Sequence, residues 1–283
     1  MKSKIIITLC LALFIVALCC NWKFEIIAIS PCYGSEQYDL KVLTWNVHCS
    51  DGADNQRQKK IAELILEVDA DFVLLNEYNQ DSCLVVDSLL KKFYPYTEEQ
   101  QSHKQLGDIF YSKRKMYTSG RISIPVMGKS VQTIKATITV NNDSVQVFGV
   151  HLMGNQYYDD VSDDALRVHN TSLEQYEISK EYRTFQTEWI KKEIMKTNLP
   201  VLLMGDMNDV NKSKPLNILC SCGLRDCWWE GGNGYGATYH DGWMRLRIDH
   251  ILHSNKLKLQ SIKVIDTNLS DHNPIVAGFS VND

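Results

Sequence analysis

Residues 201–208 read VLLMGDMN, an apolar run that passes through a glycine into Asp206 and, two positions later, Asn208. A short apolar run bounded by polar residues is typical of a buried strand. A strand end is a rigid mount, and loops along one edge of a sheet can bring many such ends to one cleft. The stretch therefore predicts a strand that presents a carboxylate and a carboxamide at the edge of a sheet.

Five other apolar runs meet polar residues in the same way. One such strand end is unremarkable, but six of them together supply carboxylates, carboxamides and imidazoles. The polar residues are Asn46, Asn76 with Glu77, His151, Asp206 with Asn208, Asp249 with His250, and Asp271 with His272. We expect these strand ends to meet at one site.

Strand-like runs in this sequence outnumber the helical segments. The runs lie at residues 40–45, 72–75, 108–111, 131–140, 145–150, 201–204, 248–252, 259–265 and 275–281, and several are rich in Val and Ile. The spacing of apolar residues predicts helices over 56–68, 84–90 and 171–197, the last with Tyr182, Phe185, Trp189 and Ile190 on one face. Because regular βαβ alternation is absent, we expect an α/β fold in which two mixed sheets pack face to face with helices outside.

Composition limits the domain count and the class of partner. The 283 residues are 44% hydrophobic and 23% charged, as in ordinary globular proteins. No linker or repeat follows residue 38, so we expect one domain over residues 38–283. The formal net charge is −4, whereas a protein that grips nucleic acid mainly through phosphates normally carries a basic face. This balance weakly disfavours a dedicated DNA-binding enzyme.

The N-terminal segment, residues 1–30, differs from the rest of the chain. Two lysines precede an apolar run from Ile5 to Cys20, which is typical of a signal peptide or signal anchor. The run is shorter than the roughly 20 residues that usually span a bilayer. The basic start would place the domain outside the cytoplasm, secreted or membrane-anchored. Cleavage, lipidation and retention as an anchor are left open, and the alternative is a buried core helix.

Six cysteines follow this segment, at positions 32, 49, 83, 220, 222 and 227. An oxidising compartment would permit disulfides, but their connectivity cannot be predicted from the sequence. The set Cys220, Cys222 and Cys227 lacks a second C-x-x-C pair or a nearby histidine at zinc-ligand spacing. Buried thiols or one disulfide are therefore favoured over a zinc site.

The predicted strand-end residues indicate a particular chemistry. Oxygen donors such as Glu77 and Asn46 suit Mg²⁺ or Mn²⁺ better than zinc. Imidazoles and carboxylates can activate a water molecule and protonate a departing oxygen. The sequence contains neither a P-loop nor a G-x-S-x-G motif, which disfavours a nucleotide-triphosphate-binding loop and a serine hydrolase.

Six short motifs, in this order, carry a resemblance to a known family. They are TWNVH at 44–48, LLNE at 74–77, GVHL at 149–152, GDMN at 205–208, RIDHI at 247–251 and SDHNP at 270–274. Together they resemble the endonuclease/exonuclease/phosphatase superfamily, which includes pancreatic-type deoxyribonuclease, neutral sphingomyelinases and inositol-polyphosphate 5-phosphatases. The resemblance covers residues 39–281. It implies a four-layer α/β/β/α sandwich and a divalent-metal-dependent phosphoester hydrolase, using Mg²⁺ or Mn²⁺.

The resemblance also implies roles for single residues. Glu77 matches the principal metal ligand, Asn46 a residue that supports the metal site, and Asp271 a residue near the metal. The implied catalytic set is His151 on the phosphate or as general acid, Asp206 and Asn208 positioning water, and Asp249 orienting His272. Whether Asp206 or His272 takes the proton from water is left open.

Some residues depart from the family pattern. Asn76 replaces a common Gln, and Val47-His48-Cys49 and Tyr78-Asn79 replace motifs usual in abasic-site enzymes. These departures lower the expectation of base-excision repair.

The substrate class stays open between a lipid head group, a sugar phosphate and nucleic acid, because specificity lies in the loops. The loops concerned are residues 97–107, 153–170 and 228–246, where Trp228, Trp229, Tyr235 and Trp243 could form an apolar lip but are expected to be buried. The alternatives are a nonspecific extracellular endonuclease and a binding module without turnover. We expect a monomer, with membrane contact through the N-terminal segment.

Overall fold

The computed structural model describes residues 38–49, 54–79, 81–99, 107–126, 129–154 and 172–281. The predicted signal or anchor segment, residues 1–30, lies outside these ranges, as do most of loops 97–107 and 153–170. Among the described residues, no helix combines the length and the apolar character needed to cross a membrane.

The first sheet has six strands in the order β13-β14-β1-β2-β4-β3. Their bounds are β13 Leu257–Val264, β14 Ile275–Val281, β1 Leu40–Asn46, β2 Phe72–Tyr78, β4 Gly107–Ser112 and β3 Tyr96–Glu99. β1 and β2 are parallel and joined by helix α2 (Asn55–Val68), and their register places Asn46 opposite Asn76. The carboxyl ends of this pair therefore lie at one edge.

The second sheet also has six strands, in the order β5-β6-β7-β8-β12-β9. Their bounds are β5 Met116–Val126, β6 Lys129–Val140, β7 Asp143–His151, β8 Val201–Asp206, β12 Asp249–Ser254 and β9 Leu224–Asp226. β7 and β8 are parallel, with helix α4 (Ser172–Ile194) between them in the chain, and β12 runs antiparallel to β8. This register places His151, Asp206 and Asp249 side by side.

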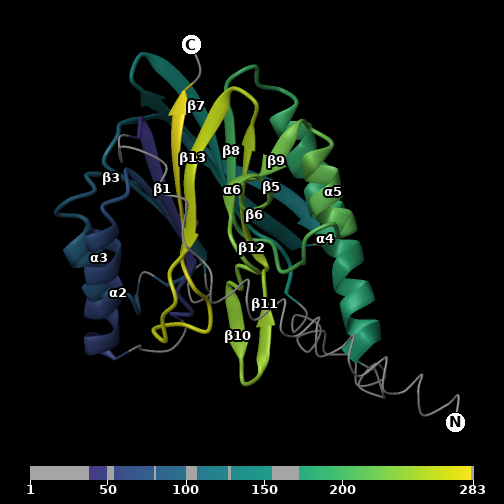
Figure 1. The fold of residues 1–283 in the computed structure, drawn as a ribbon, viewed down its shortest axis with the longest axis horizontal. Coiled ribbons are helices and arrows are strands. Elements are labelled where there is room, and N and C mark those ends of the chain that lie inside the picture. Colours follow the sequence, from purple (N-terminus) through teal and green to yellow (C-terminus); the bar gives the residue numbers. More distant parts are fainter. Residues whose placement is uncertain are drawn as a thin grey trace, which may run out of the picture.

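The two sheets pack face to face through the main hydrophobic core. Val42, Leu74 and Phe110 of the first sheet meet Ala136 and Met204 of the second, all of them fully buried. Figure 1 shows this pair of sheets between α2 and α3 on one side and α4 and α5 on the other. The layered architecture confirms the predicted fold class.

The helices cover the outer faces because each carries one apolar stripe. Ile61 and Ile65 of α2 and Val86 of α3 (Leu84–Leu90) pack on the first sheet. Ile190 of α4 and Leu216 of α5 (Lys214–Cys220) pack on the second. A short helix, α6 (Cys227–Gly231), follows β9. The side chains of Asp54, Ser213 and Asp226 accept backbone N–H groups at the starts of α2, α5 and α6.

The predicted apolar face of α4 was partly wrong. Phe185 is 44% exposed, whereas Arg183 and Gln186 are buried with Ile190. These two polar side chains face inward because they bind the neighbouring loops: Arg183 pairs with Asp209, and Gln186 accepts the N–H of Met153. Hydrophobicity alone cannot identify a helix face that is buried against polar loops.

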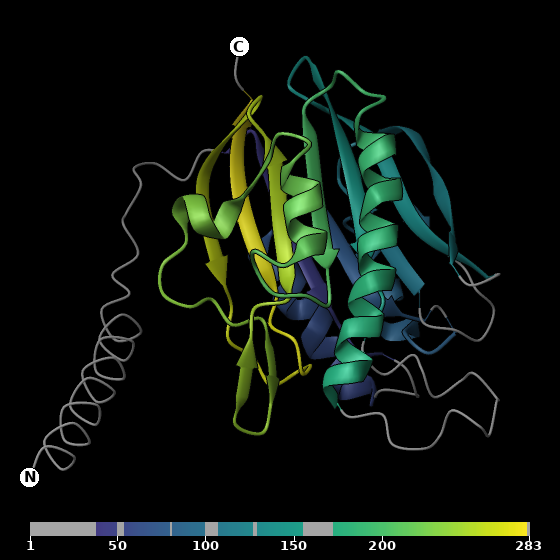
Figure 2. The same cartoon turned by 90° about the vertical axis from the view of Figure 1, so that its right-hand side faces the viewer.

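A hairpin, β10 (Tyr239–Asp241) with β11 (Met244–Leu246), stands apart from both sheets. Figures 1 and 2 show it projecting beyond one end of the sandwich. An isolated bridge joins Tyr239 to His272, so the base of the hairpin lies against the segment that precedes β14.

Candidate functional site

The parallel strand pairs deliver the predicted residues to one edge of the sandwich. Asn46 and Glu77 come from the first sheet, and His151 and Asp206 from the second. Gly205 makes the approach possible, because a Cβ at this residue would lie 1.9 Å from the Val150 carbonyl oxygen and its φ is +138°. The sequence prediction that these strand ends meet agrees with the structure.

Asp206 lies at the centre of the group and is almost fully buried. Its Oδ2 atom accepts a hydrogen bond from Asn46 Nδ2 (3.0 Å) and lies 3.7 Å from His151 Nε2 and 3.8 Å from His272 Nε2. Its Oδ1 atom accepts the backbone N–H of Asn208 (2.7 Å). Burial and the nearby Asp249 carboxylate raise the pKa of Asp206. The Asp206 carboxylate therefore accepts a proton more readily than an exposed aspartate does.

His272 is oriented by Asp249. The distance from His272 Nδ1 to Asp249 Oδ2 is 2.8 Å, and Thr238 Oγ1 accepts the backbone N–H groups of Ile248 and Asp249. Burial lowers the pKa of His272, but the carboxylates of Asp249 and Asp206 outweigh it and raise that pKa to about 10. His272 is therefore a cation at neutral pH, with Nε2 facing Asp206.

The carboxylates at this edge fit a divalent cation. Among the described residues, the ion pairs of Glu77, Asp206, Asp249 and Asp271 are all with histidines, and no lysine or arginine lies within ion-pair distance of them. Ligand atoms of Glu77, His151 and Asp206 lie within 4.8 Å of one another, as do those of Asp206, Asp249 and His272. Carboxylates gathered this closely are stabilised by a bound cation. The Glu77 side chain is partly exposed, so an ion from solvent can reach it.

Asn46 holds the carboxylates in place through its amide nitrogen. Nδ2 donates to Glu77 Oε1 (2.9 Å) and to Asp206 Oδ2, while Oδ1 accepts the backbone N–H of His48 (3.0 Å). The His48 N–H requires an acceptor, which determines the amide orientation. Asn46 therefore supports the metal site here and does not direct its oxygen into it.

The remaining predicted residues lie at the rim. Asn208 Nδ2 donates to the Leu152 carbonyl (2.9 Å), and its φ is +48°. Asp271 is 37% exposed, and its Oδ1 atom is 3.5 Å from His48 Nδ1. His48 in turn lies 3.5 Å from Glu77, so Asp271 reaches the metal-site carboxylate through this histidine.

Asp108 is a site residue that the sequence analysis missed. It is buried, accepts a hydrogen bond from Asn76 Nδ2 (2.7 Å), and lies 3.9 Å from His151 Nδ1. Burial raises the pKa of Asp108 to about 6. The sequence feature that could have identified Asp108 is its position as a carboxylate at the start of the apolar run 108–111. The unusual Asn76 is now explained, because its Oδ1 accepts the Asp206 N–H and its Nδ2 reaches the Val150 carbonyl.

The other histidines and arginines near the motifs are structural. Arg247 pairs with Asp226 (2.9 Å), not with Asp249, which settles the alternative pairing of Asp249 in favour of His272. His250 is buried against Asp226, and His253 against Glu230.

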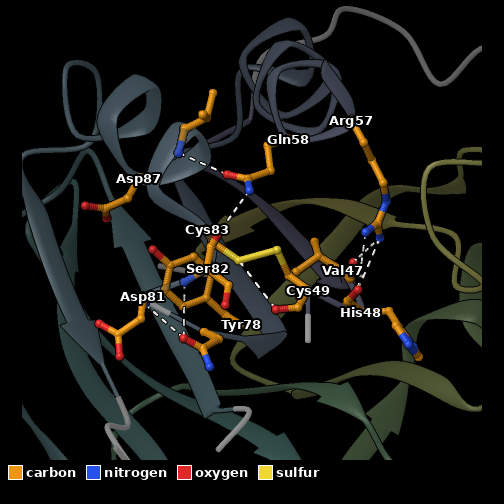
Figure 3. The surroundings of a disulfide bond; sticks show 12 residues. Val47, His48, Cys49, Arg57, Gln58, Tyr78, Asp81, Ser82, Cys83 and Asp87 are labelled. Carbon is orange, nitrogen blue, oxygen red and sulfur yellow. Dashed lines mark hydrogen bonds between the residues drawn. A yellow bond between two sulfur atoms is a disulfide. The ribbon is translucent and has the colours of Figure 1, made fainter. Parts of the chain in front are cut away.

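The cysteines and aromatic residues resolve two open expectations. Cys49 and Cys83 form a disulfide, shown in Figure 3, whereas Cys220, Cys222 and Cys227 are free thiols. Of the four aromatic loop residues predicted to be buried, three are exposed and the fourth, Trp228, is half-buried. Trp229, Tyr235 and Trp243 are exposed: Trp229 lies on helix α6, Tyr235 in the loop that follows it, and Trp243 at the tip of the β10–β11 hairpin.

Comparison with known proteins gives the same architecture. The structure is similar to truncated TDP2 from Caenorhabditis elegans, with 18% identity, a TM-score of 0.62, and coverage of 85% of this chain and 96% of that one. An endonuclease/exonuclease/phosphatase from Bacteroides vulgatus has 14% identity and a TM-score of 0.66, covering 86% and 99%. A variant of the 3′ phosphatase NExo from Neisseria, bound to a product DNA hairpin, has 18% identity and a TM-score of 0.63, covering 85% and 99%.

Sequence comparison gives the family directly. No curated protein matches the chain, but the sequence model of the Endonuclease/Exonuclease/phosphatase family matches residues 43–272. That range contains every residue of the site described above. The chain therefore belongs to the endonuclease/exonuclease/phosphatase family and is a divalent-metal-dependent hydrolase of phosphoric ester bonds.

Proposed function

We propose that this protein hydrolyses a phosphoester outside the cytoplasm by attack of water on phosphorus, with Mg²⁺ or Mn²⁺ as its metal. The observation that carries the proposal is the buried Asp206 carboxylate, which lies between the imidazoles of His151 and His272 and shares Asn46 with Glu77. A phosphate would be flanked there by two imidazoles and by the carboxylates that hold a cation.

Glu77 is the main ligand in this proposal, with Asp271 near the ion and Asn46 holding Glu77 in position. When bound, the divalent cation neutralises a phosphate oxygen and the charge that develops in the transition state. Asn208 uses one amide hydrogen on the Leu152 carbonyl, which leaves the second for a non-bridging phosphate oxygen.

The charges favour Asp206 over His272 as the base in this proposal. His272, with a pKa of about 10, already carries its proton at neutral pH and so acts as a cationic donor to phosphate. Asp206 is buried between two imidazoles with a raised pKa and accepts the proton of the attacking water. His151, beside Asp108, lies on the opposite side of Asp206 and can protonate the leaving oxygen.

The test is a panel of phosphodiesters and phosphomonoesters assayed with the purified full-length chain in Mg²⁺, in Mn²⁺ and with a chelator. We expect turnover that the chelator abolishes and either metal restores. Glu77→Gln should raise the metal concentration needed for half-maximal rate. Turnover that persists after complete metal removal would contradict the proposal.

The location outside the cytoplasm rests on residues 1–30 and needs its own test. We expect the protein in the extracytoplasmic or membrane fraction of the producing cell, and accessible to protease added from outside. Recovery in the cytoplasmic fraction alone would refute this part while leaving the hydrolase function intact.

A nonspecific extracellular nuclease is the second candidate, favoured by a cleft beside the Asn208 loop. This cleft, of about 670 Å³, is lined by residues that include Lys180, Lys212 and Lys214, and its loop begins two residues after Asn208. Lysines at this place suit the phosphates of a polymeric substrate. The structure is also similar to that of Danio rerio TDP2 complexed with a single-strand DNA product, with 19% identity, a TM-score of 0.64, and coverage of 86% of this chain and 99% of that one.

Plasmid cleavage in Mg²⁺ separates the two candidates. A nuclease should cut plasmid, and the double variant Lys212→Ala and Lys214→Ala should cut it more slowly and with weaker salt dependence. Activity restricted to small phosphoesters, with no effect of the lysine variants, would favour the first candidate.

A further inference from the structure

We propose that His48 is a ligand of the site's divalent cation and shifts its preference from Mg²⁺ toward first-row transition metals. This inference rests on the proposed function, because it assumes the cation at Glu77. It adds a nitrogen ligand to the carboxylate oxygens of Glu77 and Asp271 that the proposed function places at or near the ion.

The position of the His48 side chain carries the inference. Nδ1 lies 3.5 Å from Glu77 Oε2 and 3.5 Å from Asp271 Oδ1, so one imidazole nitrogen faces both carboxylates. The separation of His48 Nδ1 from Glu77 Oε2 is compatible with two atoms that share one ion, since ligands about 2.0–2.2 Å from a metal are about 3–4 Å apart. The His48 side chain is 54% exposed, so an ion from solvent can reach it.

The backbone holds His48 in a conformation that a non-glycine residue rarely adopts. Its φ is +42°, in the left-handed region, and Glu77 opposite it has a φ of +52°. Such backbone strain persists only where the surroundings determine it, and it concentrates at functional sites. Both residues on this side of the proposed ion are thus placed by strained backbone.

Several bonds fix the loop that carries His48. Val47 N donates to Asn76 O and Cys49 N to Glu77 O, and the Cys49–Cys83 disulfide ties the loop to the start of α3. Arg57 donates to the carbonyls of Val47 and His48. Figure 3 shows the disulfide and the bonds from Arg57, with the His48 imidazole directed away from the disulfide. The imidazole is therefore presented from a rigid support.

The identity of this ligand predicts the metal preference. Imidazole nitrogen suits Co²⁺, Zn²⁺ or Fe²⁺, whereas Mg²⁺ takes oxygen ligands and keeps its waters. Replacing His48 by Asn offers an oxygen of similar reach and should remove the preference without emptying the site. The competing explanation is that His48 only neutralises Glu77 and Asp271, in which case its loss would affect all divalent ions alike.

The first experiment measures Co²⁺ and Mg²⁺ binding to the full-length chain by calorimetry, independently of activity. For His48→Asn we expect the Kd for Co²⁺ to rise about 10- to 100-fold, and the Kd for Mg²⁺ to change less than about threefold. The matched control is His240→Asn, whose ring bonds the Thr267 carbonyl and no carboxylate, and it should change neither. Equal changes for both ions in His48→Asn would overturn the inference.

The second experiment identifies the ligand directly. In the Co²⁺-loaded protein, proton NMR should show a strongly shifted, solvent-exchangeable imidazole N–H signal. We expect this signal in the wild type, in His240→Asn and in His151→Gln, and its loss in His48→Asn. Its loss in His151→Gln with retention in His48→Asn would assign the nitrogen to His151 and overturn the inference.

The outcomes separate this inference from the function on which it rests. If the wild type binds neither ion, both fail. If His48→Asn binds Co²⁺ as the wild type does and the chelator still abolishes turnover, the inference fails and the proposed function stands. Unchanged thermal unfolding of His48→Asn in chelator would show that the variant is folded.

Discussion

Two histidine–aspartate pairs in this protein start from neighbouring residues of β12 and have different roles. Asp249 holds His272 Nδ1 at 2.8 Å, and His250, the next residue, lies with Nδ1 3.0 Å from Asp226. Successive side chains of a strand point to opposite faces, so the two pairs lie on different sides of the second sheet. Distance and residue type are nearly the same in both.

The difference lies in what surrounds each pair. His250 is fully buried, its Nε2 faces the Asp209 carbonyl, and Arg247 neutralises Asp226. His272 Nε2 instead lies 3.8 Å from the carboxylate of Asp206, which is beyond hydrogen-bond distance. A histidine with both nitrogens bonded stabilises a fold, whereas one with a nitrogen left facing a reactive carboxylate can do chemistry.

Replacing each histidine in turn by glutamine is the strongest test of this comparison. We expect His272→Gln to lower turnover about 10³-fold, since it loses the cation beside Asp206, and to lower the unfolding free energy as well, because Asp249 loses its buried partner. His250→Gln should lower the unfolding free energy by about 1–3 kcal/mol and leave kcat nearly unchanged, because it disturbs only buried hydrogen bonds. Steady-state kinetics and denaturant unfolding measure both. An active His272→Gln enzyme would break the comparison.

We expect the aspartate partners of the two histidines to differ in the same way, with Asp249 affecting turnover and Asp226 not. The effect on turnover should be smaller than that of the histidine. Asp249→Asn should lower turnover about 10²-fold, because a neutral amide no longer orients and stabilises the His272 imidazolium. The unfolding free energy should fall as well, because the variant breaks the buried ion pair of His272 with Asp249. Asp226→Asn should keep its turnover. Equal kinetic losses in the two variants would contradict the assignment.

Asp108 sharpens the comparison by adding a third carboxylate beside a histidine. The 3.9 Å distance to His151 Nδ1 is longer than in the other two pairs, so a weaker kinetic effect is expected. Asp108→Asn should lower kcat about 10-fold through His151, with KM changed less. His151→Gln combined with Asp108→Asn should be no worse than His151→Gln alone. An additive loss would show that Asp108 acts independently of His151.

Acid should weaken the pair formed by Asp226 and His250 in a defined pH range. Burial alone would raise the pKa of Asp226, but His250 and Arg247 outweigh it and lower that pKa to about 2. The stabilisation is therefore complete above the unfolded value near pH 4 and is lost as pH falls through about 2. We expect Asp226 to contribute about 2 kcal/mol to the pH dependence of unfolding in this range. Asp226→Asn should remove that component, and an unchanged pH profile in the variant would count against it.

Local sequence patterns were sufficient for most of the site. Val201–Asp206 and Phe72–Tyr78 are apolar runs that stop at polar residues, and both are strands that end at the site. Helix α3 has the predicted bounds, and α2 begins one residue early. These features depend on residues that are close together in the sequence, so a local sequence pattern is enough to predict them.

Other elements depended on distant partners. Asp108 became a site residue only because β4 pairs with β2, which brings it to Asn76. The strand β5 is stabilised by its long pairing with β6, and its own sequence is too polar to predict it. The pairing of Cys49 with Cys83 follows from the approach of the β1 loop to the start of α3.

The strand-end residues, their order and the metal-and-imidazole chemistry could be read from the chain, because hydrophobic periodicity and polar interruptions are local properties. The choice between His272 and His250 as the histidine beside Asp206, and the placement of His48 against Glu77 and Asp271, came only from the folded arrangement. The physical reason is that a side chain's role depends on the solvent, charges and bonding partners around it. Those surroundings come from segments that are far apart in the sequence, so no local pattern contains them.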